Sequence, residues 1–477
     1  MSPAAGVTPD ERRELTQLRR RVPKLERTIE RLKAENARLR EALEKARRGG
    51  KRQAAPFAKG TPKPEPKKPG RKRGDDYGKK GHRRAPDKVD EVVIVNPPEV
   101  CPFCGGVVLV TEEVCPQFQV ELPPVKPHVT RFDVHKGHCT GCRRPVVGRD
   151  PRQSSNARGA ASTHVGPRAL SVAAQLHTEL GLSFGKVERV FEELFGLPIT
   201  RGGLAQAAAR TAHALTPTYD AMVEALPKLP MVTMDESGWH VGGLPWWLWV
   251  AVGGELVVYA ILEGRGFEQA SELLAADYAG RLMVDGWAAY RGYTQAILHA
   301  CNAHLLRRCH ELLETADRGA ARVPHAVRRL LKAGLALRDL RDADDLSPAE
   351  LSAARVRLEA KMDSLLLWKP KNDENRKLLK HLENLRPGLF LYLDEPGLPA
   401  TNFLAEQAIR PAVVNRKVWG GNRTGAGAVT TEILASFFAT ARKQHLDPTT
   451  LIVPVLRSPH EVVAPLRGLG TGPPPPT

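Results

Sequence analysis

Three acidic residues stand in settings that suit metal-dependent chemistry on phosphodiesters. Asp235 and Asp285 each end a short apolar run typical of a β-strand, and Glu406 lies in a run with helical spacing. Carboxylates brought together can hold two magnesium (or manganese) ions about 4 Å apart, which would activate a water and stabilise the leaving oxygen. A product 3′-hydroxyl could then replace the water. One site would therefore serve both the cutting and the joining of DNA.

The segments around the aspartates must place them side by side. Runs of strand character cover residues 231–234, 246–252, 256–262, 281–284 and 296–300, and residues 267–278 have helical spacing. A meander of three strands, followed by a helix and then by further strands, is the element order of an α/β, RNase H-like fold. In that fold the first and fourth strands lie next to each other, so we expect Asp235 beside Asp285.

Glu406 follows a long helical stretch. We expect a catalytic domain over residues 230–445 with a Leu-, Ala- and Arg-rich helical insertion at 310–387, and a C-terminal tail at 446–477. Two alternatives remain for the acids. Glu236 is the next candidate after Asp235, and Glu406 with Arg410 has the spacing of an ordinary helical ion pair.

The charge of the chain is concentrated at its N-terminus. The 477 residues carry a net charge of +18, and residues 1–90 alone contain 28 Lys and Arg against 13 Asp and Glu. Such a basic segment favours a polyanionic partner, although a solubilising tail is the alternative. Residues 1–13 have no apolar core and no run is long enough to span a bilayer, so we expect neither a signal peptide nor membrane insertion.

Residues 11–48 carry a heptad repeat, with Leu18, Leu25, Leu32 and Leu39 at d and mainly apolar residues at a. A single Asn at a, here Asn36, fixes register and strand number in two-stranded coils. We expect a homodimer through this coiled coil, best formed after Pro23, with a lone amphipathic helix as the alternative.

Residues 49–90 are rich in Lys, Arg, Pro and Gly, a composition typical of a disordered linker. Small residues between cations would let this segment enter a DNA minor groove. A plain charged linker explains the composition equally well. The candidate DNA-binding residues are Arg71, Arg73, Lys79, Lys80, Arg83 and Arg84.

Two CxxC pairs, Cys101 with Cys104 and Cys139 with Cys142, have the spacing of a four-thiolate site for one structural zinc ion. We expect a small β zinc ribbon over residues 91–150, with strands at 108–110, 117–122 and 128–135. The alternative is four reduced cysteines in a small β module. Residues 164–226 have helical spacing and form either a helix-turn-helix or, as we favour, helices packed on the catalytic domain.

Several further side chains are candidates for the DNA site. Cys301 and His304 either support the metal or DNA site, or are a buried Cys and a capping His. We expect core packing for Trp287. The candidate phosphate ligands are Arg307, Arg308, Arg410, Arg416 and Lys417.

Four motifs together resemble the transposases of insertion-sequence family 66. They are Met234–Ser237, Val284–Trp287 with Tyr290, Cys301–His304 with Arg307 and Arg308, and Asn402–Glu406 through Arg410 to Lys417. The coiled coil, basic segment and zinc ribbon occur in the same order in that family. Ser237, Asn302 and Gln407 depart from its usual residues, but none is one of the three acids.

The resemblance implies an Asp-Asp-Glu triad of Asp235, Asp285 and Glu406. It also implies two divalent metal ions and cut-and-join chemistry on the terminal repeats of the protein's own mobile element. Implied partners are element and target DNA and small accessory proteins of the element, in a bacterial cytoplasm near the nucleoid. Two rival functions are a transcription regulator with an inactive catalytic remnant and a nuclease that cleaves but never joins.

Overall fold

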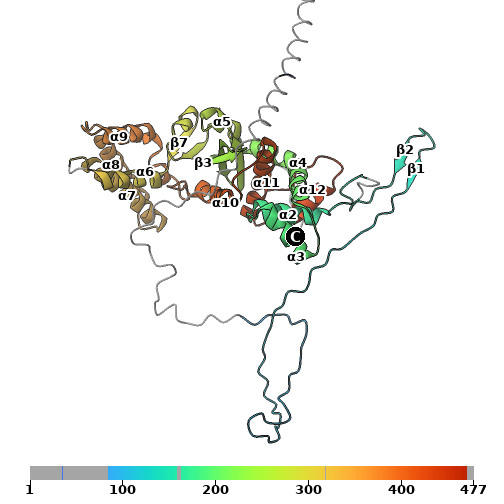
Figure 1. Cartoon of the computed structure of the whole chain (residues 1–477). Helices are drawn as coiled ribbons and strands as arrows, with labels where there is room; N and C mark the ends of the chain where they lie inside the picture. The colour runs from blue at the N-terminus through green and yellow to red at the C-terminus, as the bar shows by residue number, and fades with distance from the viewer. Residues whose placement is uncertain (1–34, 36–83, 158–162, 317–318, 470–477) are drawn as a thin grey trace, which may run out of the picture.

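The computed structural model describes residue 35 and residues 84–157, 163–316 and 319–469. At its centre lies a five-stranded mixed sheet of order β5-β4-β3-β6-β7 (Figure 1). The strands are β3 (Met231–Val241), β4 (Leu244–Gly253), β5 (Leu256–Leu262), β6 (Arg281–Val284) and β7 (Ile297–Ala300). The first three form an antiparallel meander, and β6 and β7 run parallel to β3.

Glycines make the two tight turns of the meander. Gly242 and Gly243 join β3 to β4 with φ of 60° and 80°, and Gly254 joins β4 to β5 with φ of 53°. Two consecutive positive φ values give a hairpin turn whose twist matches that of the strands. The five strands expected from the sequence are all present. β3 extends seven residues beyond the end expected at Met234. The side chains of Glu236, Trp239 and Val241 in this extension are also buried, so packing against neighbouring elements continues along the strand.

Alternate residues of the strands enter two cores, one on each face of the sheet. Val232, Met234 and Trp249 pack with α4 (Arg201–Ala225), α5 (Phe267–Leu273) and α12 (Pro448–Arg457). Trp239 and Val250 pack on the other face with α10 (Phe403–Trp419). Both faces of the sheet are therefore covered.

The outer strand β5 is covered along its edge by α11 (Gly425–Lys443). The N–H groups of Val257, Tyr259 and Ile261 donate to side chains of α11, at 2.8–2.9 Å. The acceptors are Thr440, Ser436 and Glu432, respectively. Four residues of a helix span about 6 Å, and two residues of a strand span about 6.6 Å. Every fourth residue of α11 can therefore meet every second residue of β5 over three contacts.

A helical unit separates β7 from α10, as the sequence predicts, and its first helix begins earlier than expected. It contains α6 (Asn302–Thr315), α7 (Arg322–Asp342), α8 (Pro348–Leu366) and α9 (Asp373–Leu385), which share a core of their own. Short 3₁₀ helices η5 (Arg386–Gly388) and η6 (Leu391–Leu393) return the chain to the sheet. Figure 1 shows this unit beside β7, at the end of the molecule away from α2 and α3.

Residues 164–226 fold as α2 (Pro167–Thr178), α3 (Phe184–Phe195) and α4, followed by η3 (Leu226–Lys228). Ala208, Leu215 and Met222 of α4 are buried in the same core as Trp249 and Val258 of the sheet. This packing favours the interpretation of the segment as helices covering the catalytic domain.

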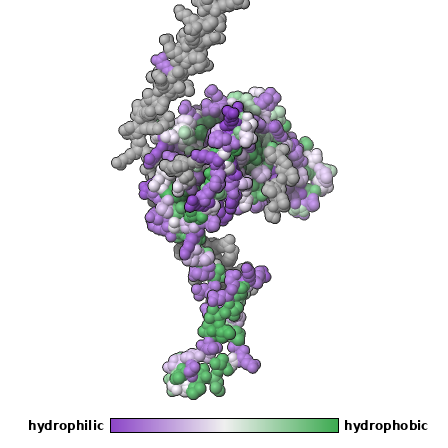
Figure 2. All heavy atoms as spheres, turned by 90° about the vertical axis from the view of Figure 1, so that its right-hand side faces the viewer, coloured by the Kyte–Doolittle hydropathy of each residue, from purple (hydrophilic) through white to green (hydrophobic). Residues whose placement is uncertain are grey.

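Residues 84–157 contain little regular structure. The expected strands at 108–110, 117–122 and 128–135 do not form, and this segment has one small sheet, β1 (Lys136–His138) with β2 (Pro145–Val147). Most of its large apolar side chains are exposed, as the green atoms of the extended segment in Figure 2 show. Paired β-strands are stable only when one face of the sheet packs on an apolar surface, and the segments expected to form strands have no such face.

The expected coiled coil, apart from Glu35, and the basic residues up to Arg83 lie outside the described residues, as do residues 470–477. Among the residues that are described, no helix is long and apolar enough to cross a membrane.

Candidate functional site

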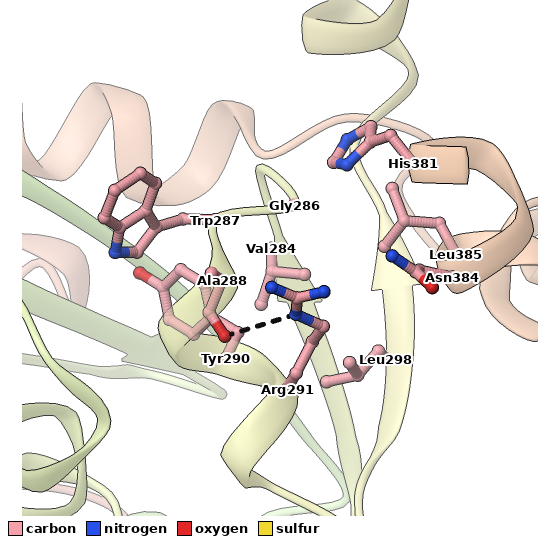
Figure 3. A pocket seen from close by; sticks show the side chains of 10 residues that line it. All are labelled: Val284, Gly286, Trp287, Ala288, Tyr290, Arg291, Leu298, His381, Asn384 and Leu385. Atoms are coloured by element: carbon pink, nitrogen blue, oxygen red, sulfur yellow. Dashed lines mark hydrogen bonds between the residues drawn. The ribbon is translucent and has the colours of Figure 1, made fainter. Parts of the chain in front are cut away.

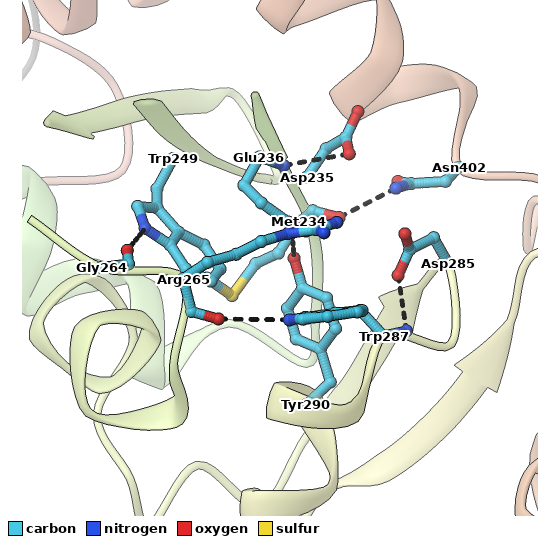
Figure 4. Close-up of polar contacts among 10 residues, drawn as sticks. All are labelled: Met234, Asp235, Glu236, Trp249, Gly264, Arg265, Asp285, Trp287, Tyr290 and Asn402. Carbon is cyan, nitrogen blue, oxygen red and sulfur yellow. Dashed lines mark hydrogen bonds and ion pairs between the residues drawn. The ribbon is translucent and has the colours of Figure 1, made fainter. Parts of the chain in front are cut away.

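Asp235 within β3 and Asp285 just after β6 lie at corresponding positions along two neighbouring parallel strands. β3 and β6 pair with Thr233 opposite Met283, so Asp235 and Asp285 stand two residues further along each chain. Figure 4 shows both carboxylates on one side of the sheet, with Asn402 between them. The neighbouring positions expected from the sequence are confirmed.

The turn after β6 fixes the direction of Asp285. Its Oδ1 accepts the backbone N–H of Trp287 at 2.7 Å. Gly286 between them has φ of 93°, and a Cβ there would clash with the ring of His381 from α9. A side chain at position 286 is therefore excluded both by backbone strain and by the helical unit.

Glu406 lies in the first turn of α10, and a buried asparagine sets the position of that turn. Asn402 donates through Nδ2 to the carbonyl of Met234 at 2.8 Å and through its backbone N–H to Cys301 Sγ at 3.2 Å. The start of α10 is thus tied both to β3, one residue before Asp235, and to the end of β7.

His304 lies between Glu406 and Cys301. Its Nε2 lies 3.7 Å from Glu406 Oε1 and its Nδ1 lies 3.3 Å from Cys301 Sγ. The contact with Cys301 is the main cause of a raised pKa for His304, and the charge of Asp285 contributes. The Cys301–His304 pair therefore lies within the site, in contact with Glu406.

Burial and negative charge dominate the electrostatics around Asp235. Burial, reinforced by repulsion from Glu236 and Asp285, raises the pKa of Asp235 to about 7. Carboxylates that repel one another in a partly desolvated place are stabilised by a bound cation. Asn402 Oδ1 is buried beside them and has no hydrogen-bond partner among the described residues. These oxygens are the hard ligands that Mg²⁺ prefers, so the donor set fits that ion.

Glu236 points away from this site into the protein. Its side chain is 1% exposed, pairs with Arg265 and accepts a hydrogen bond from Tyr290 Oη. Arg265 in turn lies over the rings of Trp247 and Trp287, at 4.8 and 3.9 Å from their centroids. The alternative candidate acid therefore belongs to a buried ion pair behind Asp235.

A pocket of about 250 Å³ opens next to Asp285, between the end of β6 and α9 (Figure 3). Trp287 and Arg291 lie on one side of it and His381 and Asn384 on the other. Trp287 is 40% exposed, so the expectation of core packing for it is wrong. Its neighbours at the turn, Asp285 and Gly286, direct the indole outward onto Arg265.

The family model for the transposase IS66 family matches residues 162–430, more than half of the chain. The chain belongs to this family. The match contains both aspartates, Glu406, the helical unit and most of the packed helices. No curated protein matches the chain. A transposase acts on DNA, and the family implies that a divalent metal takes part.

The cations predicted to bind DNA in this transposase occupy different environments. Arg307, Arg308, Arg410 and Lys417 are exposed, and Arg308 pairs with Glu374 of α9. Arg416 is only 7% exposed, and its guanidinium donates to Ser237 Oγ of β3 at 3.4 Å. Arg416 thus joins α10 to the sheet, unlike the four exposed cations.

Of the six predicted cations in the basic segment, Arg84 alone is described. Its side chain is exposed and pairs with Asp87 at 3.4 Å. Arg71, Arg73, Lys79, Lys80 and Arg83 lie outside the described residues.

The four predicted zinc ligands form two separate turns. Cys101 N–H donates to Gly106 O in one, and Cys139 N–H donates to Arg144 O in the other. Among the described residues the four sulfurs do not form one ligand group, so the zinc ribbon stays a prediction.

Sequence reasoning missed Asn402 and the role of Arg265. Asn402 was visible only as part of the Asn402–Glu406 motif, because its contacts come from residues distant in the chain. Arg265 follows β5 between two glycines, and no sequence pattern marked it, because the burial of its partner Glu236 is visible only in the structure.

Proposed function

We propose that this IS66-family transposase cuts and joins DNA at the terminal inverted repeats of its own element, through Asp235, Asp285 and Glu406. The observation that carries the proposal is the placement of two aspartates at corresponding positions of adjacent parallel strands, with Glu406 on the helix tied to the first strand. The strand order and the helix over β3 also support an RNase H-like core.

The three carboxylates and Asn402 Oδ1 would hold two magnesium or manganese ions. When bound, these ions supply the charge that makes a water or a 3′-hydroxyl nucleophilic and stabilises the leaving oxygen. Asn402 keeps the first turn of α10 against β3, and His304 holds the Glu406 side chain in the site. The protein's own contribution is therefore the fixed placement of partly buried carboxylates.

The exposed cations supply the surface for the DNA backbone. Arg307 on α6 and Arg410 and Lys417 on α10 lie on the two helices that carry His304 and Glu406. Phosphate contacts at these helices would fix a strand relative to the carboxylates without reading its sequence. The pocket with Trp287, Arg291 and Asn384 offers a place beside Asp285 for a base at the cleaved end.

The N-terminal segments would provide affinity and assembly. We propose a homodimer through residues 11–48, minor-groove contacts from residues 49–90 and a zinc ribbon at 91–150 held by Cys101, Cys104, Cys139 and Cys142. The net charge of +15 over residues 1–90 supports DNA as their partner.

A strand-transfer assay tests the proposal. The protein is incubated with Mg²⁺, a labelled duplex that carries the element's terminal sequence with a free 3′-hydroxyl, and a plasmid target. We expect a joined product that falls by at least about 100-fold in Asp285→Asn. Asp277→Asn, an exposed aspartate before β6, is the matched control and should retain the product.

Each rival function gives a different result in that assay. Cleavage without joining would identify a nuclease, and tight binding of ends without either reaction would identify a regulator. A product that persists in Asp285→Asn would show that these carboxylates are not the catalytic ones.

A further inference from the structure

Beside the two aspartates lies a second ligand set of different chemistry. A sulfur of Cys301, a ring nitrogen of His304 and a carboxylate oxygen of Glu406 all lie within 4.8 Å of one another. Among the described residues, no other group of three or more His, Cys, Asp or Glu side chains is as close. The set joins a soft ligand and a borderline ligand to a carboxylate of the candidate triad.

The fold brings these three atoms together from two helix starts. β7 ends at Ala300, Cys301 is the N-cap of α6 and His304 follows within its first turn. Glu406 comes from the first turn of α10, which Asn402 ties to Cys301 through the 3.2 Å contact with its sulfur. The spacing therefore depends on backbone contacts as well as on side-chain rotamers.

The set is closed on one side and open on the other. Cys301 is 1% exposed, whereas the side chains of His304 and Glu406 are 27% and 32% exposed. An ion can therefore reach the nitrogen and oxygen from solvent and meet the thiol at the bottom of the site. Ligand atoms around a tetrahedral zinc ion lie about 3.5 Å apart, so small side-chain rotations would complete the geometry.

We propose that Cys301, His304 and Glu406 form a site for Zn²⁺ or a similar transition-metal ion, and that occupation of it removes Glu406 from the magnesium site. Thiolate and imidazole ligands select zinc-like ions, whereas Mg²⁺ accepts oxygen and avoids sulfur. Binding forms bonds from the metal to sulfur, nitrogen and oxygen and releases the thiol proton to solvent. The inhibitory part of this inference rests on the proposed function, and the binding part does not.

Direct binding of Co²⁺, a coloured substitute for Zn²⁺, tests the site in the full chain. A cobalt–thiolate absorption that depends on Cys301 should appear, together with one bound ion beyond those held by the other cysteines. Cys301→Ser and His304→Ala should each weaken this binding by about tenfold or more. The matched controls are Cys309→Ser, a buried thiol on the same helix, and His310→Ala, an exposed histidine paired with Glu314, and both should bind as the wild type does.

The outcomes separate the two parts of the inference. Equal absorption and stoichiometry in the wild type and Cys301→Ser would overturn the site. Should Cys301→Ser fail to fold, as circular dichroism would show, the partly exposed His304→Ala decides the question in the same way. These measurements stand even where no strand transfer is found.

Competition for Glu406 is measured with Mg²⁺ held constant and Zn²⁺ added, each protein being compared with its own zinc-free activity. We expect Zn²⁺ to suppress joining in the wild type and in Cys309→Ser, and about tenfold more Zn²⁺ to be needed in His304→Ala. Full activity of a wild-type protein with the site loaded would overturn the inhibitory role.

Discussion

At the scale of single residues, the acids next to each other on β3 have opposite surroundings. Asp235 faces the open site with Asp285 and Asn402, while Glu236 is enclosed by Arg265 and Tyr290. Successive residues of a strand point to opposite faces, so adjacent acids separate into a candidate ligand and a structural ion pair. The sequence of the motif alone does not distinguish these two roles, whereas the face of β3 on which each side chain lies does distinguish them.

The buried pair of Glu236 and Arg265 gives a prediction about stability. Arg265→Ala leaves a buried carboxylate without its cation and should lower the free energy of unfolding by about 3 kcal/mol. Adding Glu236→Gln should recover part of this loss, because the amide is neutral and still accepts from Tyr290. Urea unfolding measures both variants.

The control for that prediction is Arg189→Ala, which removes an exposed ion pair on α3. We expect it to cost less than about 1 kcal/mol. A loss in Arg265→Ala no greater than in this control would contradict the structural role of the pair.

At the scale of elements, α11 and β5 are matched through Glu432, Ser436 and Thr440. Burial raises the pKa of Glu432 to about 7, although its carboxylate accepts the N–H of Ile261. Nearby Glu272 adds to the increase. Burial therefore favours the neutral side chain, whereas the hydrogen bond from Ile261 by itself favours the charged one.

This raised pKa predicts how stability changes with pH. The folded protein holds a proton on Glu432 more tightly than the unfolded chain, so its contribution to stability is lost as pH rises from about 4.5 to about 7. Glu432→Gln is neutral throughout and keeps an acceptor for Ile261. Its unfolding free energy should match the wild type at pH 5 and exceed it by roughly 1–3 kcal/mol at pH 8.

Urea unfolding at the two pH values checks this prediction. Glu192→Gln, an exposed position on α3, serves as the control and should show no pH-dependent difference. The same gain at both pH values for Glu432→Gln would refute the explanation by burial.

The elements also show what sequence patterns can and cannot provide. Apolar runs bounded by glycines predict β4 to β7 closely, because strand length and burial are local properties. Asn402 and Arg416 could not be interpreted in that way. Each looks like an ordinary polar residue near an end of α10, and its burial arises only when α10 lies on β3.

Errors in the segment 84–157 have a different cause. Alternation predicts strands at 108–110, 117–122 and 128–135, but alternation records a preference that needs a partner surface. Here most of the large apolar side chains are exposed, so the expected strands have no packed face.

At the scale of the whole molecule, the proposed homodimer depends on residues 11–48, for which the sequence predicts a parallel two-stranded coil. Leu32→Asp places a charge at a d position and should convert a dimer into a monomer at micromolar concentration. Ala34→Asp adds the same charge at the outward position f and should leave the dimer intact. Sedimentation velocity distinguishes the two, and equal masses for both variants would exclude a coiled-coil dimer.

The ladder between α11 and β5 also limits how copies of the protein can meet on DNA. An outer strand with free N–H groups is a template onto which a strand of another chain can add, and here three such groups already have acceptors. At the opposite edge, Gly388 packs so closely on Leu298 of β7 that a methyl group there would overlap the backbone. Sheet extension is thus blocked at both borders by the chain itself. Any multimer of this protein would therefore form through helices, loops or the N-terminal segments, and the central sheet is protected against cross-strand aggregation.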